Sequence, residues 1–398
     1  MQKHEILIIG GGNAGISVAA QLMRKNPRLD IAIIEPSEYH YYQPAWTLVG
    51  GGVFNQKATR RSEASVIPIG VKWIRDKVKT LVPDKNEIVT DSGTVFSYDY
   101  LVAAPGIQLD FSAVAGLEET LGKNGVCTNY RYDSAPYTLE CMKQLKPGDV
   151  AIFTSPGTPV KCGGAPQKMT YLTADYLRNK KILKEVGVEF CTAGGVLFGI
   201  KKYADELMKM VHFYGIKLRL KHDLVAVDGP NHTARFKVTD EQGNVSYIEK
   251  KFNMLGVTPP QSAPDFIKKS PLADEKGWIS VDKHSLQHTK FPNVFALGDA
   301  TNTPNSKTGA AVRKQAPVLV SNLLSSMAGK PLTAHYSGYG SCPLVVGYGK
   351  LILAEFDYTN TPTETFPFNQ AKPRWSMWIL KKYILPWLYW NRILTGKM

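Results

Sequence analysis

The sequence predicts an α/β fold with two domains of parallel sheet and helix, followed by a C-terminal region of a different character. Residues 4–9 form an apolar, strand-like run, and a glycine-rich turn and a helical run follow at once, which is typical of a βαβ unit. A second pattern of strand, loop and helix begins at Asp149. Residues 372–398 instead combine aromatic and basic side chains. The expected boundaries are 1–110 and 256–330 for the first domain, 111–255 for the second and 331–398 for the C-terminal region.

The composition is that of a large globular protein. The chain has 398 residues, enough for two to three domains with a sizeable core. Hydrophobic residues make up 43% and charged residues 21%, which excludes a disordered chain, a coiled coil and a collagen-like repeat. No long uninterrupted apolar run occurs, so we expect no membrane-spanning helix. No signal or transit pattern precedes the first strand, so we expect the protein to begin near its first structured residue.

Charge and cysteine content narrow the range of partners. Lys and Arg number 48 against 34 Asp and Glu, and the net charge of +14 favours an anionic partner such as nucleic acid, a lipid surface or an acidic small molecule. The cysteines are Cys127, Cys141, Cys162, Cys191 and Cys342. They are too few and too scattered for a disulfide framework and lack the close pairs of a zinc site, so we expect no metal.

The glycine-rich turn has the spacing of a dinucleotide-binding fingerprint. Gly10, Gly12 and Gly15 form a G-x-G-x-x-G motif between the strand and the helical run. Gly10 permits the tight turn, Gly12 lets the backbone approach a pyrophosphate, and Gly15 lets the helix pack on the strand. Glu35 ends the next strand, 20 residues after Gly15, where a carboxylate accepts ribose hydroxyls. The alternative is an empty βαβ unit, which the complete fingerprint disfavours.

A later segment indicates that the dinucleotide is FAD rather than NAD. The strand that begins near Thr289 ends in Gly298 and Asp299, similar to the second flavin signature of the two-dinucleotide-domain flavoproteins. In that family the aspartate hydrogen-bonds the ribityl chain of the flavin. Residues 100–106 resemble the strand-and-glycine return near their first domain boundary. A helix N-cap or a turn is the alternative role for Asp299. Together with the fingerprint, these features predict FAD bound to Rossmann-like domains of the FAD/NAD(P) type.

The second domain lacks the fingerprint that would bind a nicotinamide. The strand at 149–153 is followed by Pro156, Pro159 and Cys162 where a phosphate-binding turn would stand. Proline has no backbone N–H, so this loop lacks donors for an anion cradle. A helix is still expected at 169–178. We infer that electrons do not come from a nicotinamide.

Two cysteines are candidates for redox chemistry. Cys162 lies between Lys161 and Gly163, shortly before the expected helix, and a cation and a helix N-terminus both favour a thiolate. Cys342 lies in a turn-rich segment without strand or helix periodicity, so both are expected in loops. Cys141, in a helical run, and Cys191, in a strand, read as structural. Spacing alone leaves open whether Cys162 and Cys342 meet.

Longer stretches of the chain resemble the sulfide:quinone oxidoreductases, in the two-cysteine type of mitochondria and many bacteria. The resemblance covers nearly the whole chain, and the stretches around Cys162 and Cys342 are its most specific part. The stretches that carry it are 35–50, 158–168, 198–205, 306–312, 340–348, 353–358 and 389–392.

The resemblance implies an FAD-dependent enzyme that oxidises hydrogen sulfide and passes two electrons to a quinone. It implies that sulfide attacks a Cys162–Cys342 disulfide, that Cys342 holds the persulfide sulfur, and that Cys162 leaves as a thiolate. A thiol, sulfite or second sulfide then removes the sulfane sulfur. Cys127 lies near a third cysteine that bonds the flavin in some relatives, although a structural thiol is the favoured interpretation. The FAD contacts implied by fingerprint and resemblance are Gly10, Gly12, Asn13, Ala14, Gly15, Glu35, Gln43, Val78, Asp299, Gly309, Ala310, Ala311 and Val312.

Residues 372–398 are interpreted as an in-plane membrane anchor. They contain six basic residues, four of the seven tryptophans and no acid, which is typical of an interfacial segment. Pro386 is expected to split the segment into two short helices. Four residues are spaced for one helical face: Tyr383, Trp387, Trp390 and Leu394. A helix packed on the body and a nucleic-acid patch are the alternatives. We expect a peripheral, monotopic membrane protein without a nucleic-acid partner, and the resemblance places it at a bacterial cytoplasmic or mitochondrial inner membrane.

Two other functions are weighed against this one. A type II NADH:quinone oxidoreductase has a related layout, but the missing second fingerprint counts against it. A flavin-binding sensor or chaperone without enzyme activity is disfavoured by the two glycine-flanked cysteines. The sequence leaves open which quinone, which sulfur acceptor, which membrane face and whether an oligomer forms.

Overall fold

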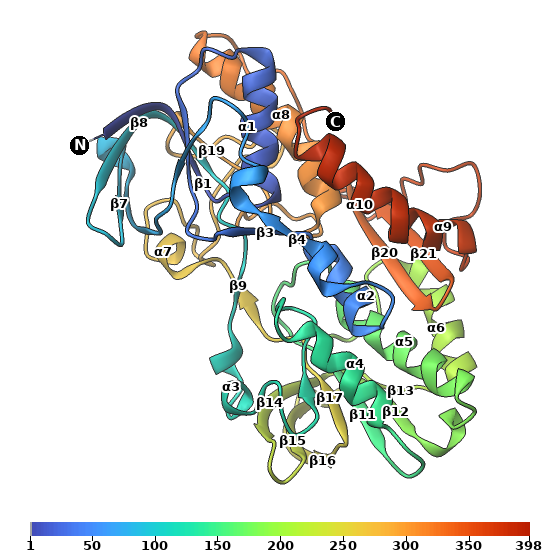
Figure 1. Ribbon diagram of the computed structural model, residues 1–398. Coiled ribbons are helices and arrows are strands. Elements are labelled where there is room, and N and C mark those ends of the chain that lie inside the picture. The colour runs from blue at the N-terminus through green and yellow to red at the C-terminus, as the bar shows by residue number, and fades with distance from the viewer. Residues whose placement is uncertain (1) are drawn as a thin grey trace.

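The computed structural model describes residues 2–398 and has two lobes, with a C-terminal segment that runs along both (Figure 1). The first lobe contains a seven-stranded sheet in the order β5-β2-β1-β8-β7-β6, with β19 paired to β8. Its central pairs are parallel, and β6 and β7 are antiparallel additions at one edge. The strands are β1 (Gln2–Ile9), β2 (Ile31–Ile34), β5 (Lys72–Ile74), β6 (Val78–Val82), β7 (Glu87–Thr90), β8 (Val95–Ala103) and β19 (Val294–Ala296).

Side chains of β1 alternate between the two faces of this sheet. Ile6 and Ile8 share a core with α1 (Asn13–Lys25) and α8 (Gly309–Met327), while Leu7 and Ile9 share the opposite core with α7 (Asp265–Lys268). Because both faces are buried, β1 reads as a nearly continuous apolar run. The glycine turn that follows β1 lies at the carboxyl edge of the sheet, where ligands bind in open α/β folds.

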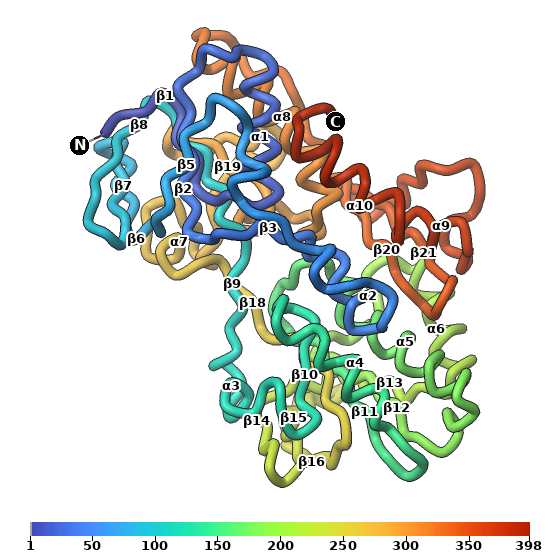
Figure 2. Tube along the Cα trace, viewed as in Figure 1, coloured from blue at the N-terminus to red at the C-terminus, as the bar shows by residue number. Residues whose placement is uncertain are grey.

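The second lobe contains a five-stranded parallel sheet, β10-β17-β11-β12-β13, and an antiparallel sheet, β14-β15-β16. The chain enters this lobe through β9 and returns to the first lobe through β18, and these two strands pair with each other (Figure 2). The elements are β9 (Gln108–Leu109), α3 (Leu117–Thr120), β10 (Val126–Cys127), α4 (Ala135–Gln144), β11 (Val150–Ser155), α5 (Ala165–Asn179), β12 (Gly187–Thr192), α6 (Lys201–Tyr214), β13 (Lys217–Arg219), β14 (His222–Asp228), β15 (Thr233–Thr239), β16 (Val245–Lys251), β17 (Met254–Gly256) and β18 (Gln261–Ser262).

The C-terminal segment belongs to the cores of both lobes. The hairpin of β20 (Gly340–Gly347) and β21 (Lys350–Phe356) packs with α5 and α6 of the second lobe. Further along, Tyr389 and Trp390 join the core that contains α1 and α8 of the first lobe. Figure 1 shows this end of the chain beside those two helices. The segment therefore ties the two lobes together.

Residues 375–393 form an unbroken succession of helical turns, so the expected break at Pro386 was wrong. α9 (Trp375–Ile379) continues into a π-helical turn, α10 (Leu385–Leu388) and a second π-helical turn. Pro386 stands in the first turn of α10, where a missing N–H is tolerated, and the wide turn before it accommodates the ring. None of the helices among residues 2–398 has both the length and the apolar character needed to cross a bilayer.

The aromatic residues of this tail divide between two faces, and the expected single face is wrong in part. Tyr383 and Trp387 are exposed, as expected, and Trp375 and Ile384 join them. Trp390 and Leu394 are buried in the first lobe instead. The π-helical turns explain the difference, because a wider turn closed by an i→i+5 hydrogen bond rotates later side chains away from a face spaced for an α-helix.

Two short elements lie between the lobes and the tail. β3 (Tyr39–Tyr41) and β4 (Arg60–Ser62) pair as an antiparallel ribbon, and α2 (Trp46–Gly50) lies between them in the chain.

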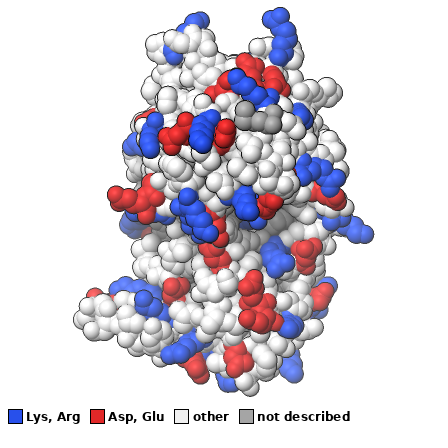
Figure 3. Space-filling model, turned by 90° about the vertical axis from the view of Figure 1, so that its left-hand side faces the viewer, with Lys and Arg blue, Asp and Glu red and all other residues white. Residues whose placement is uncertain are grey.

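On the face of the molecule shown in Figure 3, basic and acidic side chains are interspersed. The net positive charge is thus not gathered in one patch on that face.

Candidate active site

The glycine turn after β1 leaves an open anion site at the start of α1. Gly10 has a φ of +98°, and a Cβ there would lie 2.4 Å from the Ala104 carbonyl oxygen, so only glycine fits. A Cβ on Gly15 would lie 1.9 Å from the Gly10 carbonyl oxygen, so α1 packs directly on the turn. Gly12 is exposed, and no atom lies within 4 Å of its Cβ position. It precedes α1 without a side-chain cap, which leaves the first amides free for a phosphate.

Glu35 follows β2 and turns back to the same loop. Its Oε2 accepts a hydrogen bond from the Gly11 N–H at 2.7 Å, and its Oε1 accepts one from the Ser37 N–H at 2.8 Å. Burial raises the pKa of the Glu35 carboxyl, and these two hydrogen bonds oppose that effect. The carboxylate lies at the carboxyl end of the second strand, which is the position predicted for a ribose contact.

Asp299 and the start of α8 meet the start of α1. The Cβ position of Gly298 lies 3.4 Å from Ala14 Cβ and 3.6 Å from Val312, and that of Gly309 lies 3.4 Å from Asn13 Nδ2. Burial raises the pKa of Asp299, while the charges of Lys307 and Lys161 lower it, and among the described residues no hydrogen bond reaches this carboxylate. A half-buried acceptor without a partner suits a polyhydroxyl chain. These residues therefore fit FAD, with phosphate at α1, ribose at Glu35 and ribityl at Asp299.

Two other predicted FAD contacts lie elsewhere. Gln43 Oε1 accepts a hydrogen bond from Lys161 Nζ at 2.6 Å, beside the cysteine loop. Val78 opens β6, and its side chain is buried in the core with Leu81 and Ile88. Gln43 thus contacts the loop of Cys162 through Lys161, and contacts of Gln43 and Val78 with FAD stay predictions.

The fold brings Cys162 and Cys342 together, with their Sγ atoms 3.9 Å apart. Cys162 has a φ of +57° in the turn before α5. Its N–H donates to the Lys307 carbonyl at 2.7 Å, and its carbonyl accepts from the Ala165 N–H at 2.6 Å. Two backbone bonds therefore hold a conformation that costs a non-glycine residue energy, which is common at functional sites.

Cys342 is not in a loop, so that expectation was wrong. It lies in β20, fully buried, opposite Ala354 of β21. Glycine and Pro343 made this segment read as a turn. β20 pairs with β21 alone, and an edge strand tolerates proline on its unpaired side.

A lysine from α5 faces the Cys162 sulfur. Lys168 Nζ lies 3.3 Å from Cys162 Sγ, and its side chain is buried. A hydrogen bond from Cys342, and then the charge of Lys168, hold the pKa of Cys162 well below its ordinary value, although burial opposes them. The hydrogen bond to Cys162 and burial raise the pKa of Cys342. Cys162 is therefore the thiolate of the pair.

Lys161, the cation that the sequence placed beside Cys162, points elsewhere. Its ammonium bonds Gln43 and is attracted to Asp299, and burial lowers its pKa to about 8. The helix begins at Ala165, four residues before the predicted start at Met169, because Pro166 suits a first helical turn. This earlier start places Lys168 on the inward side of α5.

Sequence reasoning missed a second lysine near the cysteines. Lys381 of the C-terminal tail is 4% exposed, and its Nζ donates to the Pro44 carbonyl oxygen at 2.9 Å. Burial, and then the charge of Lys168, lower its pKa to about 7, while Cys162 and Cys342 favour the charged form. The sequence offered no clear signal, because Lys381 and Lys382 are adjacent in a tail interpreted as an in-plane membrane anchor.

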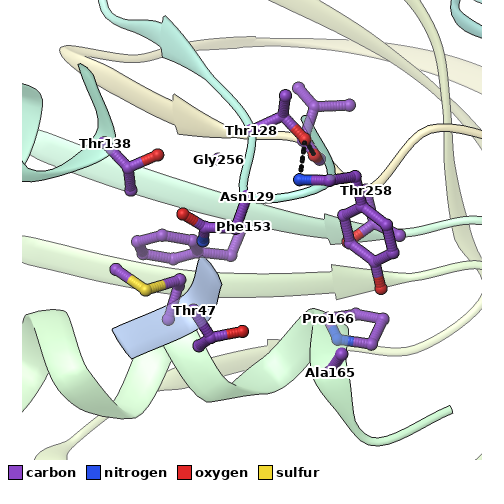
Figure 4. Close-up of a pocket in the computed structure, with 12 residues that line it drawn as sticks. Thr47, Thr128, Asn129, Thr138, Phe153, Ala165, Pro166, Gly256 and Thr258 are labelled. Carbon is purple, nitrogen blue, oxygen red and sulfur yellow. Dashed lines mark hydrogen bonds between the residues drawn. The ribbon is translucent and has the colours of Figure 1, made fainter. Parts of the chain in front are cut away.

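The second lobe contains a small cavity near the carboxyl ends of its parallel strands. A cavity of about 20 Å³ lies between the ends of β10, β11 and β17 and the start of α5 (Figure 4). Its lining includes Thr128, Asn129, Thr258 and Pro166. Such a volume holds about one water molecule and no dinucleotide.

The other cysteines lie in the core of the second lobe, as predicted for structural thiols. Cys141 is on α4 and Cys191 on β12. Cys127 is fully buried on β10, and its Sγ lies 3.6 Å from the Leu255 carbonyl oxygen. Its hydrogen bond to Cys141 and its burial raise its pKa well above the ordinary value, which disfavours a reactive thiolate.

Comparison with known proteins identifies the family. A model described as pyridine nucleotide-disulphide oxidoreductase matches residues 4–136 and 197–316. The mitochondrial sulfide:quinone oxidoreductase of Dictyostelium discoideum is 47% identical over 395 residues, covering 99% of this chain and 86% of that protein. The corresponding protein of Mus musculus is 46% identical over 393 residues, covering 99% and 87%. This chain belongs to the sulfide:quinone oxidoreductase family.

The fold is that of a solved family member. The crystal structure of the sulfide:quinone oxidoreductase from Aquifex aeolicus has a TM-score of 0.81 at 21% identity, over 98% of this chain and 92% of that one. As in the sulfide:quinone oxidoreductase family, the cofactor is FAD. The family model leaves out residues 137–196, the stretch that contains the Cys162 loop. The loop that replaces the expected nicotinamide-binding turn thus lies within the residues that the family model does not match.

Proposed function

We propose that this chain oxidises hydrogen sulfide at a Cys162–Cys342 redox pair and passes two electrons through FAD to a quinone. The observation that carries the proposal is the meeting of the two sulfurs beside the Lys168 ammonium. A loop with two prolines replaces the phosphate turn that a nicotinamide donor would need. The activity named for the relatives is the one that this arrangement suits.

In the proposed reaction, hydrosulfide attacks the Cys162–Cys342 disulfide. A new S–S bond forms at Cys342, the bond to Cys162 breaks, and Cys162 leaves as a thiolate that Lys168 stabilises. The sulfide sulfur is oxidised by two electrons, and the disulfide is reduced. An acceptor thiolate then attacks the outer sulfur of the persulfide and forms a bond to it. The bond from that sulfur to Cys342 breaks, and Cys342 becomes a thiolate. FAD supplies two-electron transfer to the quinone, which returns the pair to the disulfide.

We infer that the sulfur acceptor binds beside the Asn305–Lys307 segment, whose two end residues line a cavity. Ser306 Oγ lies 3.5 Å from Cys342 Sγ, while Asn305 and Lys307 line a cavity of about 720 Å³. Lys276 and Trp278 also line it, and Lys307 Nζ lies 4.0 Å from the centre of the Trp278 ring. This volume suits a small organic molecule. The lining carries Lys276 and Lys307 against Asp274 and Glu275, so its formal charges balance. The Lys307 ammonium over the Trp278 ring offers one cation to a small sulfur acceptor such as a thiol or sulfite.

The tail offers a surface for a membrane. Trp375, Tyr383, Ile384 and Trp387 are 69%, 56%, 45% and 56% exposed. Large exposed aromatic residues beside lysines are typical of the bilayer interface. We infer peripheral attachment through this outer face, as suits a mitochondrial inner membrane or a bacterial cytoplasmic membrane and a lipid-dissolved quinone.

Anaerobic titration of the purified holoprotein tests the function. Sulfide should bleach the flavin absorbance within seconds, and excess quinone should restore it. NADH at the same concentration should leave the spectrum unchanged. Rapid bleaching by NADH and none by sulfide would instead support the type II NADH:quinone oxidoreductase.

A further inference from the structure

A buried side chain of the tail reaches the glycine loop of the FAD site through one histidine. Tyr389 is 6% exposed, and its hydroxyl lies 2.6 Å from His40 Nε2. His40 is 3% exposed, and its Nδ1 lies 2.9 Å from the Gly11 carbonyl oxygen. A carbonyl only accepts, so Nδ1 donates, and in neutral His40 the Nε2 accepts the Tyr389 O–H. The chain of bonds runs from residue 389 to residue 11.

Gly11 is held from three sides. Glu35 accepts its N–H, and His40 donates to its carbonyl. The Glu63 carboxylate, 1% exposed, fills the third side, because a Cβ on Gly11 would lie 2.4 Å from Glu63 Oε1. Glu63 Oε2 lies 3.4 Å from His40 Nδ1, while Oε1 has no hydrogen-bond partner in the described part of the chain. The conformation of the FAD loop thus depends on His40 and on two carboxylates.

The tail is seated firmly at this point. Tyr389 and Trp390 pack on Tyr42, with ring centres 4.7 and 6.3 Å away. The Arg61 guanidinium lies 4.3 Å from the centre of the Trp390 ring. Further on, Gln21 Nε2 of α1 donates to the Met398 carbonyl oxygen at 3.2 Å. The tail therefore packs along the helix whose N-terminus faces the phosphate.

We propose that Tyr389 and His40 form a latch that retains FAD, in which the tail holds the Gly10–Gly12 turn in its binding conformation. Both are positioning residues, because they touch the loop or each other and carry no part of the reaction. Loss of the Tyr389–His40 bond leaves the imidazole free to turn and removes the donor that fixes the Gly11 carbonyl. The turn then samples other conformations, and FAD leaves faster. The latch needs neither sulfide nor quinone. It can therefore be tested independently of the proposed reaction.

The test measures FAD release from full-length holoprotein in lipid-free buffer, by the rise in fluorescence of free FAD after dilution. Tyr389→Phe keeps the ring and removes the hydroxyl, and it should speed release about tenfold, as expected for one buried hydrogen bond. Tyr383→Phe is the matched control, since this tyrosine lies in the same tail and is exposed. It should release FAD within about twofold of the native rate.

A second variant and a double mutant keep the test decisive. Arg61→Ala removes a surface contact to Trp390 and should speed release a few-fold without affecting folding. In a His40→Asn background, Tyr389→Phe should add nothing, because the two residues act through one bond. Native release rates in both Tyr389→Phe and Arg61→Ala would overturn the latch. Equal acceleration by Tyr389→Phe and Tyr383→Phe would overturn it as well.

Discussion

Lys168 Nζ lies 3.3 Å from Cys162 Sγ, although the two residues are separated by the turn into α5. The cation comes from the second turn of the helix, so it is fixed by the helix rather than by the loop. Cys162 also precedes the N-terminus of α5, where partial positive charge favours a thiolate. One short segment thus supplies the thiolate, its counter-ion and a helix dipole.

Lys168→Met should raise the pKa of Cys162 in the reduced enzyme. Removal of an opposite charge at this distance shifts an ionisation by about 1–3 pH units. The measurement is the pH dependence of iodoacetamide alkylation at Cys162, followed by mass spectrometry. Lys161→Met is the control for this pKa, because that ammonium bonds Gln43 instead. A larger shift in the pKa of Cys162 with Lys161→Met than with Lys168→Met would mean that Lys161 is the counter-ion of Cys162.

Cys162→Ser and Cys342→Ser should each abolish sulfide-dependent quinone reduction and retain FAD. The two sulfurs act as one unit, so the double variant should be no slower than either single one. Cys127→Ser is the control and should keep substantial activity, because its thiol is fully buried on β10 and donates to the Leu255 carbonyl oxygen rather than to either sulfur of the pair. Quinone reduction assays with flavin-normalised enzyme give the rates. Loss of activity together with flavin release on denaturation in Cys127→Ser alone would point to a covalent flavin link.

Glu35→Ala and Asp299→Ala should lower flavin occupancy, because each removes a charged acceptor from the FAD site. The ratio of flavin to protein absorbance after purification reports the occupancy. Glu38→Ala is a suitable control, since Glu38 lies close by in the chain but is exposed and pairs with Arg75. Full occupancy in both site variants would contradict the assigned contacts.

The membrane face can be tested without truncation. Removal of all residues after Gln370 also removes Lys381 and Tyr389, which are part of the folded core, so it would damage more than an anchor. The triple variant Trp375→Ser, Tyr383→Ser and Trp387→Ser should lose co-sedimentation with anionic vesicles and keep FAD. Phe213→Ser with Tyr247→Ser, two exposed aromatic residues of the second lobe, is the control. Added salt should weaken the binding of the native protein to the vesicles, since part of that binding is electrostatic.

Lys381 should make stability depend on pH between about 7 and 10.5. Its pKa is lower in the folded protein, so the unfolded chain binds more protons across this window and stability rises with pH. Lys381→Met removes that dependence. The gain in thermal midpoint of the variant over the native protein should therefore be largest below pH 7 and should fade towards pH 10.5. A difference that does not change with pH would mean that Lys381 is not buried in its charged form.

Local features of the site could be predicted from the sequence. The β1 strand, the glycine turn and Glu35 lie within one βαβ unit, and their roles depend on steric rules that hold in any such unit. The placement of Cys162 shortly before a helix was also predictable. Its counter-ion was not predictable from the sequence. The conformation of the turn into α5 decides whether the side chain of Lys161 or that of Lys168 faces the Cys162 sulfur.

The tertiary relationships could not be derived from spacing. Cys342 read as a loop residue because Pro343 and the glycines are turn formers, while burial in an edge hairpin decided its structure. Trp390 and Leu394 read as lipid-facing because their spacing fits an α-helix, while π-helical turns rotate them into the first lobe. In both cases the tertiary packing, rather than the local sequence pattern, determined the structure.

The contact between Tyr389 and His40 sets an order of events during biosynthesis. Because synthesis runs from the N-terminus to the C-terminus, the glycine loop leaves the ribosome long before Tyr389 does. In the proposed latch, a nascent chain can fold its first βαβ unit early, yet it lacks the contact that retains the nucleotide until Tyr389 has been added. Stable flavin loading would then require the tail, and a chain that stops before Tyr389 would keep a nucleotide site without this contact.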